Sequence, residues 1–220
     1  MSTMPLAETM KEKNQPQHMV FVVDDDESMR VALSYLFQSM NLPVKVFNSA
    51  AELLKSKLPD IASCLVLDIR LPGVSGLEFQ DVLARAEIRI PIVFITGHGD
   101  IPMSVKAMKA GAVDFLTKPF RDQDMLDAVT RALDLDRKRR EGERAVSGLR
   151  ARFESLTPRE REVLTHVTSG LMNKQTAGLL KVSEITVKIH RGQVMKKMEA
   201  RSLAELVKRA EMLGISRTKL

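Results

Sequence analysis

The sequence predicts an α/β domain with a doubly wound, five-stranded parallel sheet, followed by a small all-α domain. In the first 120 residues, short runs rich in Val, Ile, Leu and Phe alternate with stretches whose apolar residues recur at helical spacing. Strict alternation of strand and helix is typical of a parallel sheet that helices cover on both faces. From Leu156 onward the pattern is helical. The expected strands are residues 19–23, 44–47, 64–67, 92–95 and 113–116.

Two helices of the sheet domain are expected at residues 27–40 and 102–110, and a third carries an apolar stripe from Met125 to Leu133. Beyond Asp136 this stripe thins into mixed charge, and two glycines, at positions 142 and 148, disfavour a continuous helix. A coiled coil that dimerises through this connector stays an alternative. The expected domains are the sheet domain, residues 18–136, a helical or partly flexible linker, residues 137–154, and the helical domain, residues 155–220.

Capping residues mark the helices of the C-terminal domain. Thr157 is expected as an N-cap, with Pro158 at the first helical position and Glu160 three residues after the cap. The other expected boundary residues are Gly170 at the end of this helix, Asn173 as the N-cap of the second, Glu184 near the start of the third, and Ser202 with Glu205 as a capping box for the fourth.

Composition places the chain among globular proteins of a reducing compartment. The chain has 220 residues, of which 44% are hydrophobic, and one cysteine, Cys64, within an apolar run, so no internal disulfide can form. The first residues lack the apolar stretch of a signal peptide, and no run approaches the ~20 apolar residues that span a bilayer. We therefore expect a cytoplasmic protein without a membrane partner.

Charge is distributed unevenly along the chain. Residues 1–120 hold 12 Lys and Arg against 14 Asp and Glu, whereas residues 121–220 hold 22 against 14. Within residues 155–220 the count is 13 against 6. A small, strongly basic domain favours a polyanionic partner.

Acidic, hydroxyl and cationic residues follow the expected strands. Asp24 and Asp25 come after the first strand, Asp68 after the third, Thr96 after the fourth and Lys118 after the fifth. The carboxyl ends of parallel strands share one edge of a sheet, where ligands of such sheets bind. The carboxylates suit a hard divalent ion such as Mg²⁺. Asp68 is then a candidate nucleophile for phosphoryl transfer, with Thr96 and Lys118 on the transferred oxygens.

Four motifs carry a family resemblance that extends from about Val20 to Ala210. They read "VFVVDDDESMR", "LVLDIRLPGVSG", "ITGHGDIPMSVKAMKAGAVDFLTKPF" and "LTPREREVL" with "MNKQTAGLLKVSEITVKIHR". Together they resemble a two-component response regulator of the FixJ/NarL type. The resemblance implies a flavodoxin-like receiver, a LuxR-type helix-turn-helix domain and regulation of transcription. It also implies three kinds of partner: a sensor histidine kinase, double-stranded promoter DNA with RNA polymerase, and a second copy of the chain after phosphorylation.

The resemblance also assigns roles within the receiver. It implies that Asp68 is the phosphoacceptor, and that Asp24, Asp25, Asp68 and the backbone carbonyl of Arg70 hold Mg²⁺. Asp26 lies outside this set, as a charge at a helix start. The peptide bond between Lys118 and Pro119 should be cis.

A switch and a dimer face follow from the same resemblance. Thr96 should move toward the phosphoryl group while Phe115 turns inward. Some receivers have a tyrosine at the latter position, so a role for Phe115 as a core aromatic stays an alternative. The resemblance implies that receivers pair through the fourth helix and the fifth strand of the sheet domain, here the face that carries Val105 and Lys109.

In the C-terminal domain, the third helix is expected to enter the major groove of DNA. Val187, Val194 and Met198 should pack inward, and the opposite face should be free for DNA. Gly192 departs from the longer polar residue found in this family, so the family's base readout is not carried over. An ordinary solvated helix is the alternative for this stretch taken alone. The residues expected to contact DNA are Asn173, Lys174, Thr186, Lys188, Ile189, Arg191, Gln193 and Lys196.

Two other classes of function compete with this interpretation. A metal-dependent phosphohydrolase would also form an aspartyl phosphate, but Ile69 and Arg70 follow Asp68 where a second acid would protonate a leaving group. A nucleotide-binding module would need a glycine-rich loop after the first strand, where this chain has acids. The regulator, which is not an enzyme apart from assisting its own phosphorylation and dephosphorylation, is the favoured interpretation.

Overall fold

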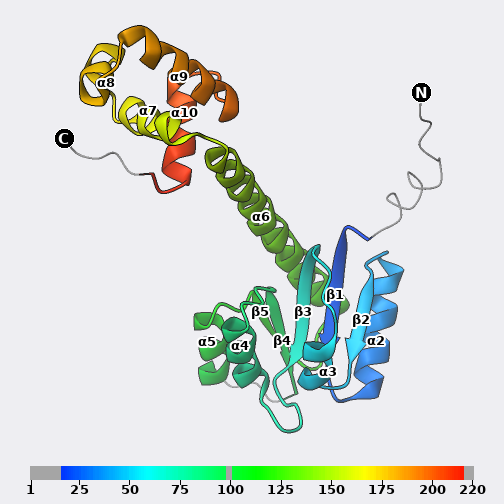
Figure 1. The fold of residues 1–220 in the computed structure, drawn as a ribbon. Coiled ribbons are helices and arrows are strands. Elements are labelled where there is room, and N and C mark those ends of the chain that lie inside the picture. The colour runs from blue at the N-terminus through cyan, green and yellow to red at the C-terminus, as the bar shows by residue number, and fades with distance from the viewer. Residues whose placement is uncertain (1–15, 98–100, 216–220) are drawn as a thin grey trace, which may run out of the picture. The chain divides into compact units, whose positions relative to one another are not determined.

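A computed structural model describes residues 16–97 and 101–215. The chain divides into two compact units, residues 1–140 and residues 141–220. The first unit contains a parallel sheet of five strands in the order β2-β1-β3-β4-β5 (Figure 1). The predicted fold class is therefore confirmed. The strands are β1 (His18–Val23), β2 (Val44–Phe47), β3 (Ala62–Asp68), β4 (Ile92–Thr96) and β5 (Asp114–Thr117).

Helices cover both faces of this sheet because side chains alternate between the faces along each strand. Phe21 and Val23 of β1 belong to one core, together with residues of α3, α4 and α5. Val20 and Val22 belong to the other core, which α2 and the first part of α6 complete. The helices are α2 (Glu27–Ser39), α3 (Ala50–Lys55), α4 (Gly76–Arg85), α5 (Ile101–Lys109) and α6 (Asp122–Glu154).

The strand order creates a switch point between β1 and β3. From β1 the chain crosses to β2 on one side, and β3 then pairs with β1 on the other side, with Val22 beside Val66. Because the connections leave β1 and β3 in opposite directions, a crevice opens at their carboxyl ends. Asp24 and Asp68 lie at this crevice.

Helix α6 continues through Gly142 and Gly148 without interruption. Met125 and Val129 are buried against the sheet. Further along, the buried Asp136 carboxylate accepts hydrogen bonds from the backbone N–H of Ser63 (2.9 Å) and from Nε of Arg140 (2.7 Å). These contacts hold α6 against the amino end of β3, opposite the acidic edge.

The second unit has its own core, which includes Val163, Leu164, Val187 and Leu206. Its first helix begins as predicted: Thr157 and Glu160 form a capping box with Pro158 in the first turn. The helices that follow α6 are α7 (Pro158–Thr168), α8 (Asn173–Leu180), α9 (Glu184–Lys197) and α10 (Leu203–Met212).

Two capping predictions for this unit were wrong. Met172, rather than Asn173, is the N-cap of α8, because Gln175 accepts the Met172 backbone N–H (2.8 Å). Ser202 caps α10, but the Glu205 carboxylate accepts the backbone N–H of Arg201 (2.8 Å), so the expected reciprocal box does not form. The helices themselves form where they were predicted.

Across the two described stretches of the chain, no helix combines the length and the apolarity needed to cross a bilayer.

Candidate functional site

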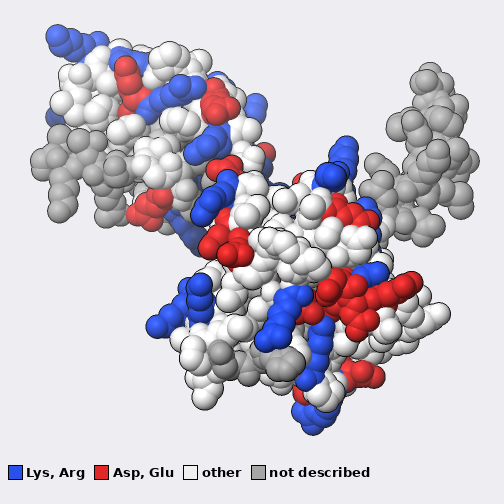
Figure 2. All heavy atoms as spheres, turned by 90° about the horizontal axis from the view of Figure 1, so that it is seen from below, with Lys and Arg blue, Asp and Glu red and all other residues white. Residues whose placement is uncertain are grey.

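Three carboxylates meet where β1 and β3 end. Asp24 and Asp25 follow β1, and Asp68 is the last residue of β3. Each offers an oxygen atom, and these atoms lie within 4.8 Å of one another. Asp24 and Asp68 are buried, whereas Asp25 is exposed. Figure 2, which looks onto this edge of the sheet, shows acidic side chains gathered beside basic ones. Carboxylates this close repel one another unless a cation lies among them.

Lys118 supplies one such cation from the end of β5. Its Nζ atom lies 2.7 Å from Oδ2 of Asp24 and 2.7 Å from Oδ2 of Asp68. Burial opposes the charged form, but the hydrogen bonds to both carboxylates outweigh it and raise the pKa of Lys118 above its ordinary value. The backbone N–H of Lys118 donates to the carbonyl of Thr96 (2.7 Å), and the peptide bond to Pro119 is cis, as the resemblance implies.

Asp24 is fixed through both its backbone and its side chain. Nη1 of Arg30 donates a 2.7 Å hydrogen bond to the backbone carbonyl of Asp24. The backbone N–H of Asp26 donates to Oδ1 of Asp24 (2.9 Å), while Asp26 itself caps α2 through the N–H of Ser28. Burial raises the pKa of Asp24 above its ordinary value, although Lys118 and the Asp26 N–H favour the ionised form. A cation bound beside Asp24 would lower this pKa, because it stabilises the ionised carboxylate.

Asp68 presents its two oxygens to different partners. Oδ1 accepts the backbone N–H of Arg70 (3.0 Å), and Oδ2 accepts Nζ of Lys118. Behind it, the backbone N–H of Gly76, the first residue of α4, donates to the carbonyl of Ile69 (2.8 Å). The carboxylate is therefore held at the strand end with a defined orientation, as a nucleophile requires.

The switch candidates lie around this carboxylate. Thr96 is buried at the end of β4, next to β3 in the sheet. Phe115 is half-buried and packs against the core that contains Phe94. Val105 and Lys109 are exposed on α5. The structure thus brings Thr96 and Lys118 to the acidic edge and leaves the predicted dimer face open.

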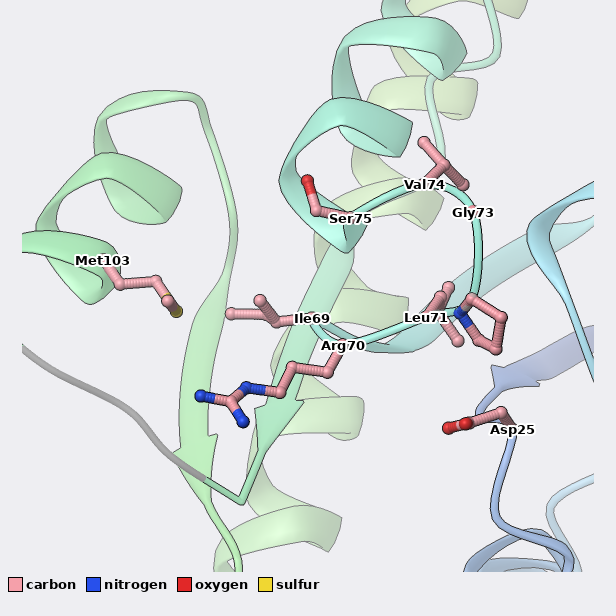
Figure 3. A pocket seen from close by; sticks show the side chains of 9 residues that line it. Asp25, Ile69, Arg70, Leu71, Gly73, Val74, Ser75 and Met103 are labelled. Carbon is pink, nitrogen blue, oxygen red and sulfur yellow. The ribbon is translucent and has the colours of Figure 1, made fainter.

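An open pocket borders the carboxylates along the loop from β3 to α4. The exposed side chains of Asp25 and Arg70 lie on opposite sides of it, and Met103 of α5 lies beyond Ile69 (Figure 3). Because the pocket is open to solvent, a group on another molecule can approach the acidic edge from this side.

The donor set fits a hard divalent cation. It consists of three carboxylates. Those of Asp24 and Asp68 are buried, and that of Asp25 faces solvent. Mg²⁺ prefers oxygen ligands and keeps several waters, so it suits a site with one open side. Such a cation beside a positioned carboxylate and the ammonium of Lys118 makes an environment that neutralises a transferring phosphoryl group.

Helix α9 is the candidate nucleic-acid interface of the second unit. Val187, Val194 and Met198 are buried, as predicted. The backbone between α8 and α9 turns at Lys181, which has a left-handed conformation (φ 53°), and Ser183 caps α9. Two short helices joined by a tight turn present α9 outward.

The predicted DNA contacts fall into two groups. Lys174, Lys188, Ile189, Gln193 and Lys196 are exposed on α8 and α9. Two other pairs are engaged within the protein. The Thr186 hydroxyl lies 2.8 Å from that of Ser183, the N-cap of α9. Nη1 of Arg191, in the middle of α9, donates to Oδ1 of Asn173 at the start of α8 (3.1 Å).

Comparison with known proteins decides the family. Residues 20–130 match the family described as Response regulator receiver domain, and residues 154–210 match Bacterial regulatory proteins, luxR family. The chain is 63% identical over 198 residues to Nodulation protein W of Bradyrhizobium diazoefficiens, which covers 90% of this chain and 87% of that protein. The chain belongs to the response regulator family.

Two further comparisons extend along most of the chain. Transcriptional regulatory protein FixJ of Azorhizobium caulinodans is 41% identical over 197 residues, covering 90% of this chain and 93% of that protein. The solved structure of the response regulator StyR has a TM-score of 0.82 and 49% identity, and covers 89% of this chain and 99% of the other. Our response regulator is thus a phosphorylation-dependent transcription regulator, which decides against the phosphohydrolase and nucleotide-binding alternatives.

One exposed residue of this response regulator was missed by the sequence reasoning. Ile185, in the first turn of α9, is 73% exposed, on the same side as Ile189. The spacing in the sequence could have predicted this exposure. Ile185 lies four positions before Ile189 and therefore faces outward on a helix whose Val187 faces inward.

Proposed function

We propose that Asp68 accepts a phosphoryl group from a sensor histidine kinase with Mg²⁺ as cofactor, and that the phosphorylated protein dimerises and binds promoter DNA in the cytoplasm. One observation carries the proposal: Lys118 lies 2.7 Å from both Asp24 and Asp68, so a nucleophile, a second acid and a cation share one site. Asp25 adds a third carboxylate that faces solvent.

The proposed reaction is a displacement at phosphorus. An oxygen of the Asp68 carboxylate attacks the phosphorus atom of a phosphohistidine and forms a P–O bond. The P–N bond breaks, and its electron pair stays on the imidazole nitrogen of the kinase. Lys118 then transfers its hydrogen bonds to the new phosphoryl oxygens, and the hydroxyl of Thr96, the last residue of the neighbouring strand β4, binds another of these oxygens.

The residues that would hold Mg²⁺ are Asp24, Asp25, Asp68 and the backbone carbonyl of Arg70. The ion neutralises the phosphoryl oxygens when it is bound. The support is the chemistry of the donor set and the open pocket beside Asp25 and Arg70.

Phosphorylation acts as a population shift between two states of the receiver. Thr96 and Phe115 are the proposed switch residues, and the helix face with Val105 and Lys109 pairs with a second copy. Val105 is 44% exposed, so burial of this side chain is available to a partner. Sedimentation should show that a phosphoryl mimic raises dimer content and that Val105→Asp suppresses the rise, because an unpaired charge would be buried. An unchanged rise would place the interface elsewhere.

The proposed domains keep the predicted bounds: receiver 18–136, linker 137–154 and DNA-binding domain 155–220. The buried contacts of Asp136 support a receiver that extends at least to this residue. In the last domain, α9 enters the major groove, Asn173 and Lys174 contact phosphates, and Lys188 contacts a base edge. RNA polymerase is the proposed further partner. The other proposed DNA contacts are Thr186, Ile189, Arg191, Gln193 and Lys196.

Labelling with radioactive acetyl phosphate tests the acceptor. Asp68→Asn should abolish Mg²⁺-dependent labelling, because the amide is neither a nucleophile nor a strong metal ligand. Asp26→Asn is the matched control: it removes a neighbouring carboxylate but keeps an effective N-cap for α2, so labelling should persist. Undiminished labelling of the Asp68 variant would refute the assignment.

A further inference from the structure

Two large aliphatic side chains lie uncovered on helix α9. Ile185 is 73% exposed and Ile189 is 60% exposed, whereas Val187 and Val194 of the same helix are buried. Residues four apart share one face of a helix, so the two isoleucines form a continuous aliphatic strip on the outer face. Neither belongs to the core of the C-terminal unit.

The surroundings of this strip indicate what covers it. Lys188 is exposed next to Ile189, and α9 carries four cationic residues and a single acid, Glu184. An apolar protein surface that covered the strip would also bury Lys188 without a partner, which is costly. The major groove of DNA instead offers phosphates to the cations and the C5-methyl groups of thymine to apolar side chains.

We propose that Ile185, together with Ile189, reads thymine methyl groups in the major groove, so that the promoter half-site carries thymines at both contact positions. This rests on the proposed function, in which α9 enters the groove. Ile185 is the second residue of α9, and helices of this kind contact base edges with their N-terminal residues.

The geometry also limits the spacing of the thymines. Four residues of α-helix rise about 6 Å, which corresponds to roughly two base-pair steps of 3.4 Å. One turn further on, Gly192 offers no side chain, and a Cβ there would meet nothing within 4 Å. Apolar contacts with bases are therefore confined to the first two turns of α9. Lys188 contacts the base edge between the two thymine methyl groups.

The test uses the full-length protein, with acetyl phosphate and Mg²⁺ present as the proposed function requires, and a randomised duplex library, because the target sequence is unidentified. Wild type and Ile185→Ala are each used to select bound sequences. Wild type should enrich a motif with thymines about two base pairs apart, and the variant should lose the preference at one of them. Circular dichroism melts of the two proteins should coincide, because the removed atoms are exposed.

A thermodynamic cycle then tests direct contact. In the enriched duplex, each thymine is replaced by deoxyuridine, which lacks only the methyl group. Loss of the contacted methyl should weaken wild type roughly fourfold, the equivalent of about 0.8 kcal/mol for one buried carbon group. At the thymine that Ile185 contacts, the same replacement should leave the affinity of Ile185→Ala unchanged, whereas the thymine that Ile189 contacts should stay sensitive with both proteins. Deoxyuridine at flanking thymines should affect neither protein.

The outcomes separate this inference from the proposed function. An enriched motif that is insensitive to deoxyuridine, or in which each thymine is equally sensitive with the two proteins, would overturn methyl readout by Ile185 and leave DNA binding intact. A fall in self-association of Ile185→Ala without a change in DNA affinity would assign the strip to a second copy and also overturn the inference. Failure to enrich any motif would refute DNA binding by α9 itself.

Discussion

A Cβ atom on Gly76 would lie 2.5 Å from the backbone carbonyl oxygen of Asp68. The first turn of α4 therefore packs directly on the backbone of the proposed phosphoacceptor. A residue with a Cβ atom at position 76 could not approach this closely.

Gly76→Ala should destabilise the receiver by roughly 1–3 kcal/mol, because backbone atoms must move to admit the methyl group. Gly142→Ala is the matched control. Gly142 lies within α6, and a Cβ there meets nothing within 4 Å, so this change should stabilise the protein by about 0.5–1 kcal/mol through helix propensity. Denaturant unfolding of the full-length variants measures both effects. Equal effects of the two substitutions would show that the close approach is absent.

Lys118→Met should lower the stability of the receiver by on the order of 3 kcal/mol in the absence of divalent cations, because two buried carboxylates lose their cation. Addition of Mg²⁺ should then raise the melting temperature more for the variant than for wild type, since the ion relieves a larger repulsion. Thermal scans with and without Mg²⁺ check this. A smaller rise in the variant would mean that Lys118 helps to retain the ion.

The stability of the C-terminal domain should fall in acid through Glu160. Burial opposes ionisation of this group, but hydrogen bonds from Lys197 (2.7 Å) and from the backbone N–H of Thr157 (2.8 Å) outweigh it and lower its pKa below 4.5. A lowered pKa contributes stability that is present above pH 4.5 and lost as the pH falls through the folded-state value. Glu160→Gln should be less stable than wild type at neutral pH. Its stability should also depend less on pH below pH 4.5. Parallel pH profiles would contradict this role.

Two lysines should separate affinity from specificity. Lys174→Ala should weaken cognate and scrambled DNA alike and reduce the salt slope by about one unit, as loss of a phosphate contact does. Lys188→Ala should cost roughly 1–3 kcal/mol on the cognate duplex and much less on the scrambled one. Titrations at several salt concentrations distinguish the two. Equal weakening of both duplexes by Lys188→Ala would make it another backbone contact.

Much of the fold could be predicted because burial imposes strong patterns. The strands follow from apolar runs such as "VFVV", and their shared edge brings Asp24, Asp68 and Lys118 together, as the distances from Lys118 now show. Alternation of strand and helix was sufficient to predict this, since parallel sheets leave few topologies.

The details that sequence missed depend on competition between local hydrogen bonds. Asn173 is a favourable capping residue, yet its side chain accepts from Arg191, eighteen positions away, and Gln175 satisfies the helix start instead. The two capping arrangements use hydrogen bonds of similar strength, so no local sequence pattern decides which of them forms. The continuity of α6 through Gly142 similarly reflects neighbouring helix formers that outweigh a cost of about 1 kcal/mol.

The central claim is that a phosphoryl group on Asp68 controls DNA binding. The most direct test is the affinity of the full-length protein for a duplex selected from the randomised library, measured with and without acetyl phosphate and Mg²⁺. Wild type and Asp26→Asn should bind more tightly when both reagents are present, and Asp68→Asn should not respond. An equal gain in affinity for Asp68→Asn, or no gain for wild type, would contradict the account.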